Sequence, residues 1–418
     1  MHSVGQIVHH LVTLPLPGVV SNATAGKTRT CRPDEGFFRG SNVKENRLIH
    51  LECARGIASI AVVFHHFSLA FVPELKAAFW LGGLLYTPLY AVLNGDGAVN
   101  YFFMLSGYVF TLRFYRNYSG NALAISVIKR LPRLMIPAGG SILLGYLVLR
   151  YFPTLHQEAA AISGSSWLSK FGNSYLPAHH VPTLGDAARQ TLVVFFRARD
   201  SYYNSNLWTM SNEFFGSLLV FGLIYVVMRL VPKSGRTITV IHFLGILLSA
   251  EFHHNFVPFL VGSYLAYLNS VGVSKIRMSS SGALMVSVVA LACFSTDNWV
   301  VLTVGSLLVM AVLIGHEGIS LIMSGKVGKF LGNLSFPLYL VHTLVILSLS
   351  SFIFATLSDL HFHHLSVLLL TMCITLTVSF LVAMPFMVLD RRWVAWLNEF
   401  TRTMVGNISM MIGRWALR

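Results

Sequence analysis

Residues 51–66 read LECARGIASIAVVFHH, a stretch in which ionisable side chains interrupt an otherwise apolar run. Its composition predicts a membrane-spanning helix. In such a helix Arg55 and His66 differ by only about 20° in direction and lie about 16 Å apart along the axis. They therefore face one side, whereas His65 points about 80° away from Arg55. An ionisable group inside a span is costly and by default marks a functional site, although a lone arginine could also reach lipid phosphates and a lone histidine could be a core residue.

The composition of the whole chain is that of a polytopic membrane protein. Of its 418 residues, 55% are hydrophobic and only 11% are charged, against about 25% charged residues in soluble domains. The net charge of +14 does not indicate nucleic-acid binding, because the basic residues stand in short runs between apolar segments, as in cytoplasmic loops. The four cysteines are scattered without metal-ligand spacing, so we expect no metal site.

The apolar runs predict an all-α integral membrane protein with about ten transmembrane helices. A further apolar stretch, 77–93, is broken by glycine and proline and is expected to be re-entrant or interfacial. The ten runs are 51–72, 97–112, 134–152, 207–230, 238–251, 255–271, 282–297, 298–315, 333–355 and 365–389.

The charges of the connecting segments predict the orientation. Lys and Arg gather in 113–133 and in alternate loops after it, whereas the short loops of the other set carry acids and no Lys or Arg. By the positive-inside rule, both termini are cytoplasmic. The expected organisation is a cytosolic tail (1–46), a transmembrane domain (47–392) with a long extracytoplasmic loop (153–206), and a cytosolic C-terminal tail (393–418). That loop lies where a substrate could be held.

Two further sets of charges are candidate site residues. Arg130 and Arg133 are three residues apart, so on a helix they are neighbours that could grip a phosphate. Ordinary positive-inside charge explains them equally well. Glu213 lies about 9 Å inside a span that begins near Leu207. A carboxylate there needs a partner, and His66 or His342 is the expected one, for structural or for catalytic reasons.

The remaining candidates lie on the ninth predicted span. His342 stands inside it, with Tyr339 one turn earlier.

The step Ser106-Gly107, in the predicted span 97–112, permits close helix contact and is interpreted as packing. The chain has no P-loop and no Gly-x-Ser-x-Gly elbow.

Together these segments resemble the membrane acyltransferase-3 family, the polytopic O-acyltransferases. The family pattern of an arginine, ten residues and a histidine matches Arg55 and His66. Four more family motifs occur in order over about residues 47–392. Their matching residues are Phe102 to Gly107; Arg130, Arg133 and Pro137; Leu207, Trp208 and Glu213; and Gly332, Ser335, Leu338, Tyr339 and His342.

The resemblance implies transfer of an acyl group, acetyl being the expected one, from cytoplasmic acyl-CoA to a hydroxyl group. The acceptor is expected to be a carbohydrate, while a lipid or a small molecule stays open, as does a homo-oligomer. His66 would act as general base or acyl carrier, with Glu213, His342 and Tyr339 as further catalytic residues. Arg55, Arg130 and Arg133 would bind the CoA phosphates. The alternative is a proton-coupled transporter that uses the same residues as a relay, but the paired halves typical of transporters are not found.

Overall fold

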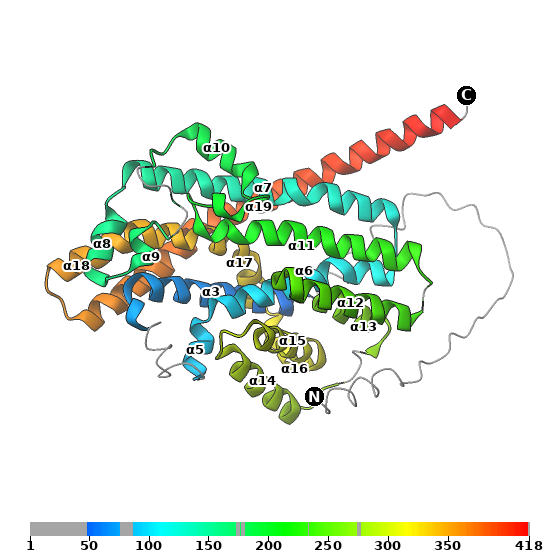
Figure 1. Ribbon diagram of the computed structural model, residues 1–418, viewed down its shortest axis with the longest axis horizontal. Helices are drawn as coiled ribbons and strands as arrows, with labels where there is room; N and C mark the ends of the chain where they lie inside the picture. The colour runs from blue at the N-terminus through cyan, green and yellow to red at the C-terminus, as the bar shows by residue number, and fades with distance from the viewer. Residues whose placement is uncertain are drawn as a thin grey trace.

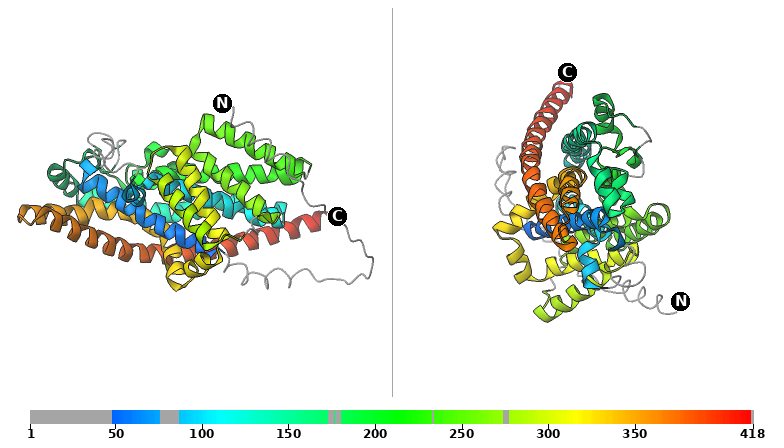
Figure 2. Two further views of the ribbon diagram at one scale, coloured as in Figure 1. Left: turned by 90° about the horizontal axis from the view of Figure 1, so that it is seen from below. Right: turned by 90° about the vertical axis from the view of Figure 1, so that its left-hand side faces the viewer.

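The computed structural model describes residues 48–75, 87–172, 176, 180–232, 234–273 and 277–416, and side chains up to residue 404. The expected N-terminal tail (1–46) and most of the expected re-entrant stretch lie outside the described residues. Within them, every regular element is a helix. Long helices run side by side along the molecule (Figure 1), and the view along its length shows them as a bundle (Figure 2).

The central pair of helices is α3 (Ile49–Phe71) and α17 (Lys326–Val345), which pack along each other. The span that α17 begins, Lys326–Asp359, has 67% of its most apolar window buried, against 17% for α12 (Gly235–Phe252). The first is therefore the core of the bundle, and the second lies at its periphery. Pro337 stands inside α17, where it removes one backbone hydrogen bond.

The other long helices surround this pair. They are α6 (Gly95–Arg116), α7 (Gly120–Tyr151), α11 (Trp208–Tyr225), α13 (Val257–Ser270), α14 (Ser280–Phe294), α15 (Trp299–Gly315) and α19 (His364–Ala416). The shorter ones are α5 (Pro88–Leu93), α8 (Leu155–Ser163), α9 (Ser166–Ser169), α10 (Leu184–Val193), α16 (Glu317–Met323) and α18 (Ser351–Asp359). Single turns η1 (Ala198–Asp200), η2 (Ser205–Leu207) and η4 (His254–Phe256), with π-helical η3 (Val226–Leu230) and η6 (Ile346–Ser350), extend or connect them.

The all-α membrane architecture is confirmed, but the expected ten spans are not. Among the described residues, six helices are long and apolar enough to cross a membrane, or seven if α15 and α16, bent by 93° at their junction, form one span. All ten predicted runs do fall on helices. At 1.5 Å per residue, however, α13 and α14 are only about 21 to 23 Å long, less than the hydrocarbon core of about 30 Å. Helix α6 has the length but carries Asp96, Arg113 and Arg116.

Three segments differ from the loops expected from sequence. Most of 113–133 is the first part of α7, which begins at Gly120. The described part of 153–206 folds into α8, α9, α10 and short turns. Helix α19 continues past residue 392 to Ala416 and projects from the bundle (Figure 1).

Glycines allow the closest helix contacts. A Cβ added to Gly56 of α3 would lie 2.6 Å from the backbone carbonyl of Leu331 on α17. A Cβ at Gly107 of α6 would overlap the backbone of Phe259 on α13. The packing role predicted for the Ser106-Gly107 step thus agrees with the structure, and the contact at Gly56 sets the distance between α3 and α17.

Candidate active site

Two histidines from the central helix pair meet inside the bundle. Nδ1 of His66 on α3 lies 3.0 Å from Nε2 of His342 on α17. His342 is fully buried and His66 is half-buried. Arg55 and His66 both contact α17, which confirms that they share a face. His65 instead lies 3.0 Å through Nδ1 from the carbonyl oxygen of Leu93, as its different helical phase predicts.

The hydrogen bonds of the two rings assign the positions of their protons. Nδ1 of His342 lies 3.0 Å from the carbonyl oxygen of Leu338, which can only accept. Nδ1 therefore carries the proton in the neutral ring, and Nε2 presents its lone pair to His66. Nδ1 of His66, which also lies 3.1 Å from the carbonyl oxygen of Val62, must then be a donor. In the neutral form of His66, this leaves Nε2 as the basic nitrogen.

Asn206 also contacts His342. Its amide nitrogen donates to the carbonyl oxygen of Tyr339 at 3.0 Å and lies 3.5 Å from Nε2 of His342, and it also bonds the hydroxyl of Thr343. The amide oxygen of Asn206 is buried and, among the described residues, has no hydrogen-bond partner. A buried polar atom of this kind calls for a partner, such as a bound water or a ligand hydroxyl.

Tyr339 lies one turn from His342, and its hydroxyl is directed to the start of α11. Its hydroxyl donates to the carbonyl oxygen of Asn206 at 2.7 Å and lies 2.9 Å from the hydroxyl of Thr209. The phenol is buried, and these two contacts of its hydroxyl connect α17 to the start of α11.

Trp167 of α9 stacks on His66, with ring centroids 5.4 Å apart and ring planes 28° apart. The segment 153–206 therefore reaches the histidine pair. His156, in the same segment, contributes to its packing. His156 packs edge-on against Phe171, and burial lowers its pKa to about 4, so its ring is neutral at physiological pH.

Arg55 lies at the other end of the shared face of α3. Its Nε donates to the hydroxyl of Ser335 at 2.8 Å, and its Nη2 lies 2.7 Å from a carboxylate oxygen of Glu52 and 3.4 Å from the carbonyl oxygen of Gly332. About one third of the Arg55 side chain is exposed.

The sequence predicts a histidine as the partner of Glu213, but in the structure Glu213 pairs with Arg130. The Arg130 guanidinium bonds a carboxylate oxygen of Glu213 directly, and its Nε donates to Ser217 at 2.9 Å. Ser106 donates to the same carboxylate at 2.8 Å. Arg130 is buried and lies over the ring of Phe110 at 4.4 Å. Arg130 is the partner because α7 packs against α11 and brings the guanidinium to the carboxylate.

One cavity of about 180 Å³ brings the three predicted arginines together. Three carboxylates also line it, so the formal charges balance. Two of these carboxylates are already paired, but in the part of the chain that the structure describes, no carboxylate lies within ion-pair distance of Arg133. The polar and charged residues that line the cavity are Glu52, Arg55, Ser106, Arg130, Arg133, Thr209, Glu213, Ser335, Tyr339 and Asp390.

The cavity and the histidine pair are joined by shared residues. Tyr339 and Thr209 line the cavity, and the Tyr339 hydroxyl bonds Asn206, which contacts His342. Sequence reasoning missed Asn206 and the stacking of Trp167. Asn206 precedes an apolar span directly, a signal that was available, whereas no local pattern marks Trp167.

This chain matches a protein-family model, although it matches no individual protein significantly. No curated protein and no solved structure is significantly similar to this chain. The model of the acyltransferase-3 family, described as an acyltransferase domain, matches residues 48–384, most of the chain. The matched region begins with α3 and extends into α19, so it contains the histidine pair and the arginine-lined cavity. The chain therefore belongs to the acyltransferase-3 family of membrane acyltransferases.

Proposed function

We propose that this chain transfers an acyl group, acetyl being the expected one, from cytoplasmic acyl-CoA to a hydroxyl group of an acceptor, a carbohydrate being the expected class. The observation that carries the proposal is the contact between His66 and His342. It fixes the proton of His66 on Nδ1, so Nε2 is the base for a hydroxyl proton.

The reaction then proceeds with His66 as general base. Nε2 of His66 takes the hydroxyl proton while the hydroxyl oxygen forms a bond to the thioester carbonyl carbon. The carbon–sulfur bond breaks, and the departing thiolate takes this proton from Nε2. Positive charge on His66 is stabilised by the Nε2 lone pair of His342, 3.0 Å away, in the way that an acceptor supports the imidazolium of a catalytic triad.

The donor is proposed to bind with its phosphates at the arginine end of α3. About 16 Å of helix separates Arg55 from His66, a span that an extended pantetheine arm can cover. A cavity of about 180 Å³ is smaller than the roughly 300 to 1,000 Å³ of common ligand pockets, so it would take in only part of the donor. Arg133 and the exposed part of Arg55 are the groups proposed to meet phosphate.

Arg130 and Glu213 are assigned a different role from the one that the family motifs suggested. Because each is bound by the other, neither charge is available for phosphate or for histidine without breaking a buried pair. We propose that they shape the cavity wall and hold α7 against α11. Tyr339 likewise positions α17 through its two hydroxyl contacts.

Binding of acetyl-CoA to the purified full chain tests the donor site. Arg133→Gln is expected to weaken binding about tenfold, the loss typical of one charge-assisted phosphate contact. The control is Arg150→Gln, a change of the same kind at the other, exposed end of α7. Binding that is equal in wild type, Arg133→Gln and Arg150→Gln would reject the phosphate role. A wild-type chain that binds no acetyl-CoA would reject the donor itself.

A further inference from the structure

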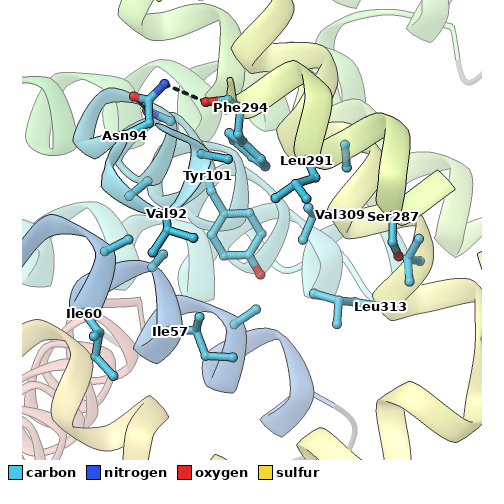
Figure 3. Close-up of a pocket in the computed structure, with 18 of the residues that line it drawn as sticks. Ile57, Ile60, Val92, Asn94, Tyr101, Ser287, Leu291, Phe294, Val309 and Leu313 are labelled. Carbon is cyan, nitrogen blue, oxygen red and sulfur yellow. Dashed lines mark hydrogen bonds between the residues drawn. The ribbon is translucent and has the colours of Figure 1, made fainter. Parts of the chain in front are cut away.

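A second and larger cavity lies on the opposite side of α3 from the candidate active site. Its volume is about 470 Å³, and it is lined by residues of α3, α5, α6, α14, α15 and α16 (Figure 3). Its lining is almost entirely aliphatic and aromatic. Ile57, Ile60, Val92, Leu291 and Leu313 illustrate this character.

Three polar side chains line this cavity, those of Asn94, Tyr101 and Ser287, and the first two are engaged elsewhere. The amide nitrogen of Asn94 donates to the carbonyl oxygens of Phe294 and Thr296, each at 2.9 Å. The Tyr101 hydroxyl donates to the carbonyl oxygen of Leu51 at 3.1 Å, and Figure 3 shows its ring standing in the cavity wall. Water needs two to four polar partners to occupy a buried site. Water is thus a poor occupant of this one, and an apolar ligand is a good one.

The cavity is continuous with the apolar outer surface of the bundle. Three of its apolar lining residues are also exposed, Ile57 to 52%, Val92 to 47% and Leu291 to 40%. The outer face of α14 beside it carries exposed aliphatic side chains, among them Leu284 and Val288. In a membrane protein such a surface faces lipid, so the opening leads into hydrocarbon.

The length and the charges at one end indicate which lipid fits. The lining of α3 extends from Ala54 to Phe64, about 15 Å of helix, which equals half of a hydrocarbon core of about 30 Å. Met323 lines the cavity near the Ala54 end, and the exposed Lys326 and Lys329 follow at the start of α17. A chain one leaflet deep with an anionic headgroup complements both features.

We infer that this cavity binds one hydrocarbon chain of an anionic membrane lipid, with the headgroup at the level of Lys326 and Lys329. The site is separate from the acyl-transfer centre, because it uses the face of α3 that points away from Arg55 and His66. The inference does not depend on the proposed function.

Photolabelling of the full chain in lipid nanodiscs tests the site. The probe is phosphatidylglycerol with a diazirine in one acyl chain, and labelled peptides are located by mass spectrometry. Labels are expected on cavity residues of α3 and α14, above the level on the outer face of α12. Ala61→Leu and, independently, Ala91→Leu fill the cavity from two helices. Each is expected to reduce cavity labelling about tenfold, because two methylene groups of the lipid chain lose their burial and binding weakens by about that factor.

The matched control is Ala292→Leu, which adds the same side chain at an exposed position of α14 outside the lining. It should leave cavity labelling unchanged. Cavity labelling no higher than that on α12, or equal in wild type and both filled variants, would overturn the site. The same chain on a phosphatidylcholine headgroup should label the cavity less. Equal labelling by the two lipids would overturn the assignment of an anionic lipid.

Discussion

The buried pair of Arg130 and Glu213 is the most sensitive feature at the scale of single residues. Removing one partner leaves an uncompensated buried charge, which costs about 3–5 kcal/mol, whereas replacing both with apolar residues is often close to neutral. We therefore expect Glu213→Leu, which leaves the buried Arg130 unpaired, to destabilise the chain by that amount, Arg130→Met by less because Glu213 is 16% exposed, and the double variant to recover most of the loss. Thermal or denaturant unfolding in detergent measures this. If the destabilisation of the double variant equals the sum of the losses of the two single variants, the two charges do not stabilise each other.

Residue positions on one helix were well predicted, and partners between helices were not. Helical periodicity separates His66 from His65, and the structure agrees, because Nδ1 of His66 contacts His342 whereas Nδ1 of His65 contacts the carbonyl oxygen of Leu93. The partner of Glu213 could not be derived from sequence. It depends on which of several distant helices packs against α11, and that is decided by the whole bundle.

At the scale of elements, the approach of α3 to α17 controls the site. Gly56→Ala would bring a methyl group to 2.6 Å from a backbone carbonyl of α17, and backbone atoms cannot move aside as a flexible side chain can. We expect α3 and α17 to separate, with about 1–3 kcal/mol of lost stability and a larger loss of activity, because the histidine contact lengthens.

Gly222→Ala on α11 is the control for this change, because an added Cβ there meets no atom within 4 Å. Replacing an unconstrained helical glycine with alanine should be neutral or stabilising by up to about 1 kcal/mol. Equal behaviour of the two variants, in unfolding and in acyl transfer, would contradict the role given to the helix contact.

Apolar runs predicted the helices better than they predicted membrane spans. Each predicted run falls on a helix, because apolar periodicity reports burial. Burial inside a helical bundle and burial in lipid give the same signal, however. Helix α13 shows the consequence: it is apolar and well packed, yet has only 14 residues.

For the molecule as a whole, the prediction of two cytoplasmic termini can be tested by topology reporters. A reporter that is active only in the cytoplasm, fused in turn to each end of the chain, should be active in both fusions. The physical reason is the Lys and Arg excess in alternate loops. A seven-span arrangement, which the helix lengths also permit, places the termini on opposite sides, so activity at one end alone would overturn the prediction.

The central claim is that His66, set by His342, is the base for acyl transfer. Its most direct test is incorporation of labelled acetyl groups from acetyl-CoA by membranes that contain wild type, His66→Ala or His65→Ala at equal amounts of folded protein. Loss of a general base lowers rates by about 10²- to 10⁴-fold. We predict that loss for His66→Ala and a rate near wild type for His65→Ala, whose ring points to Leu93. A His66→Ala chain with the wild-type rate would contradict the account.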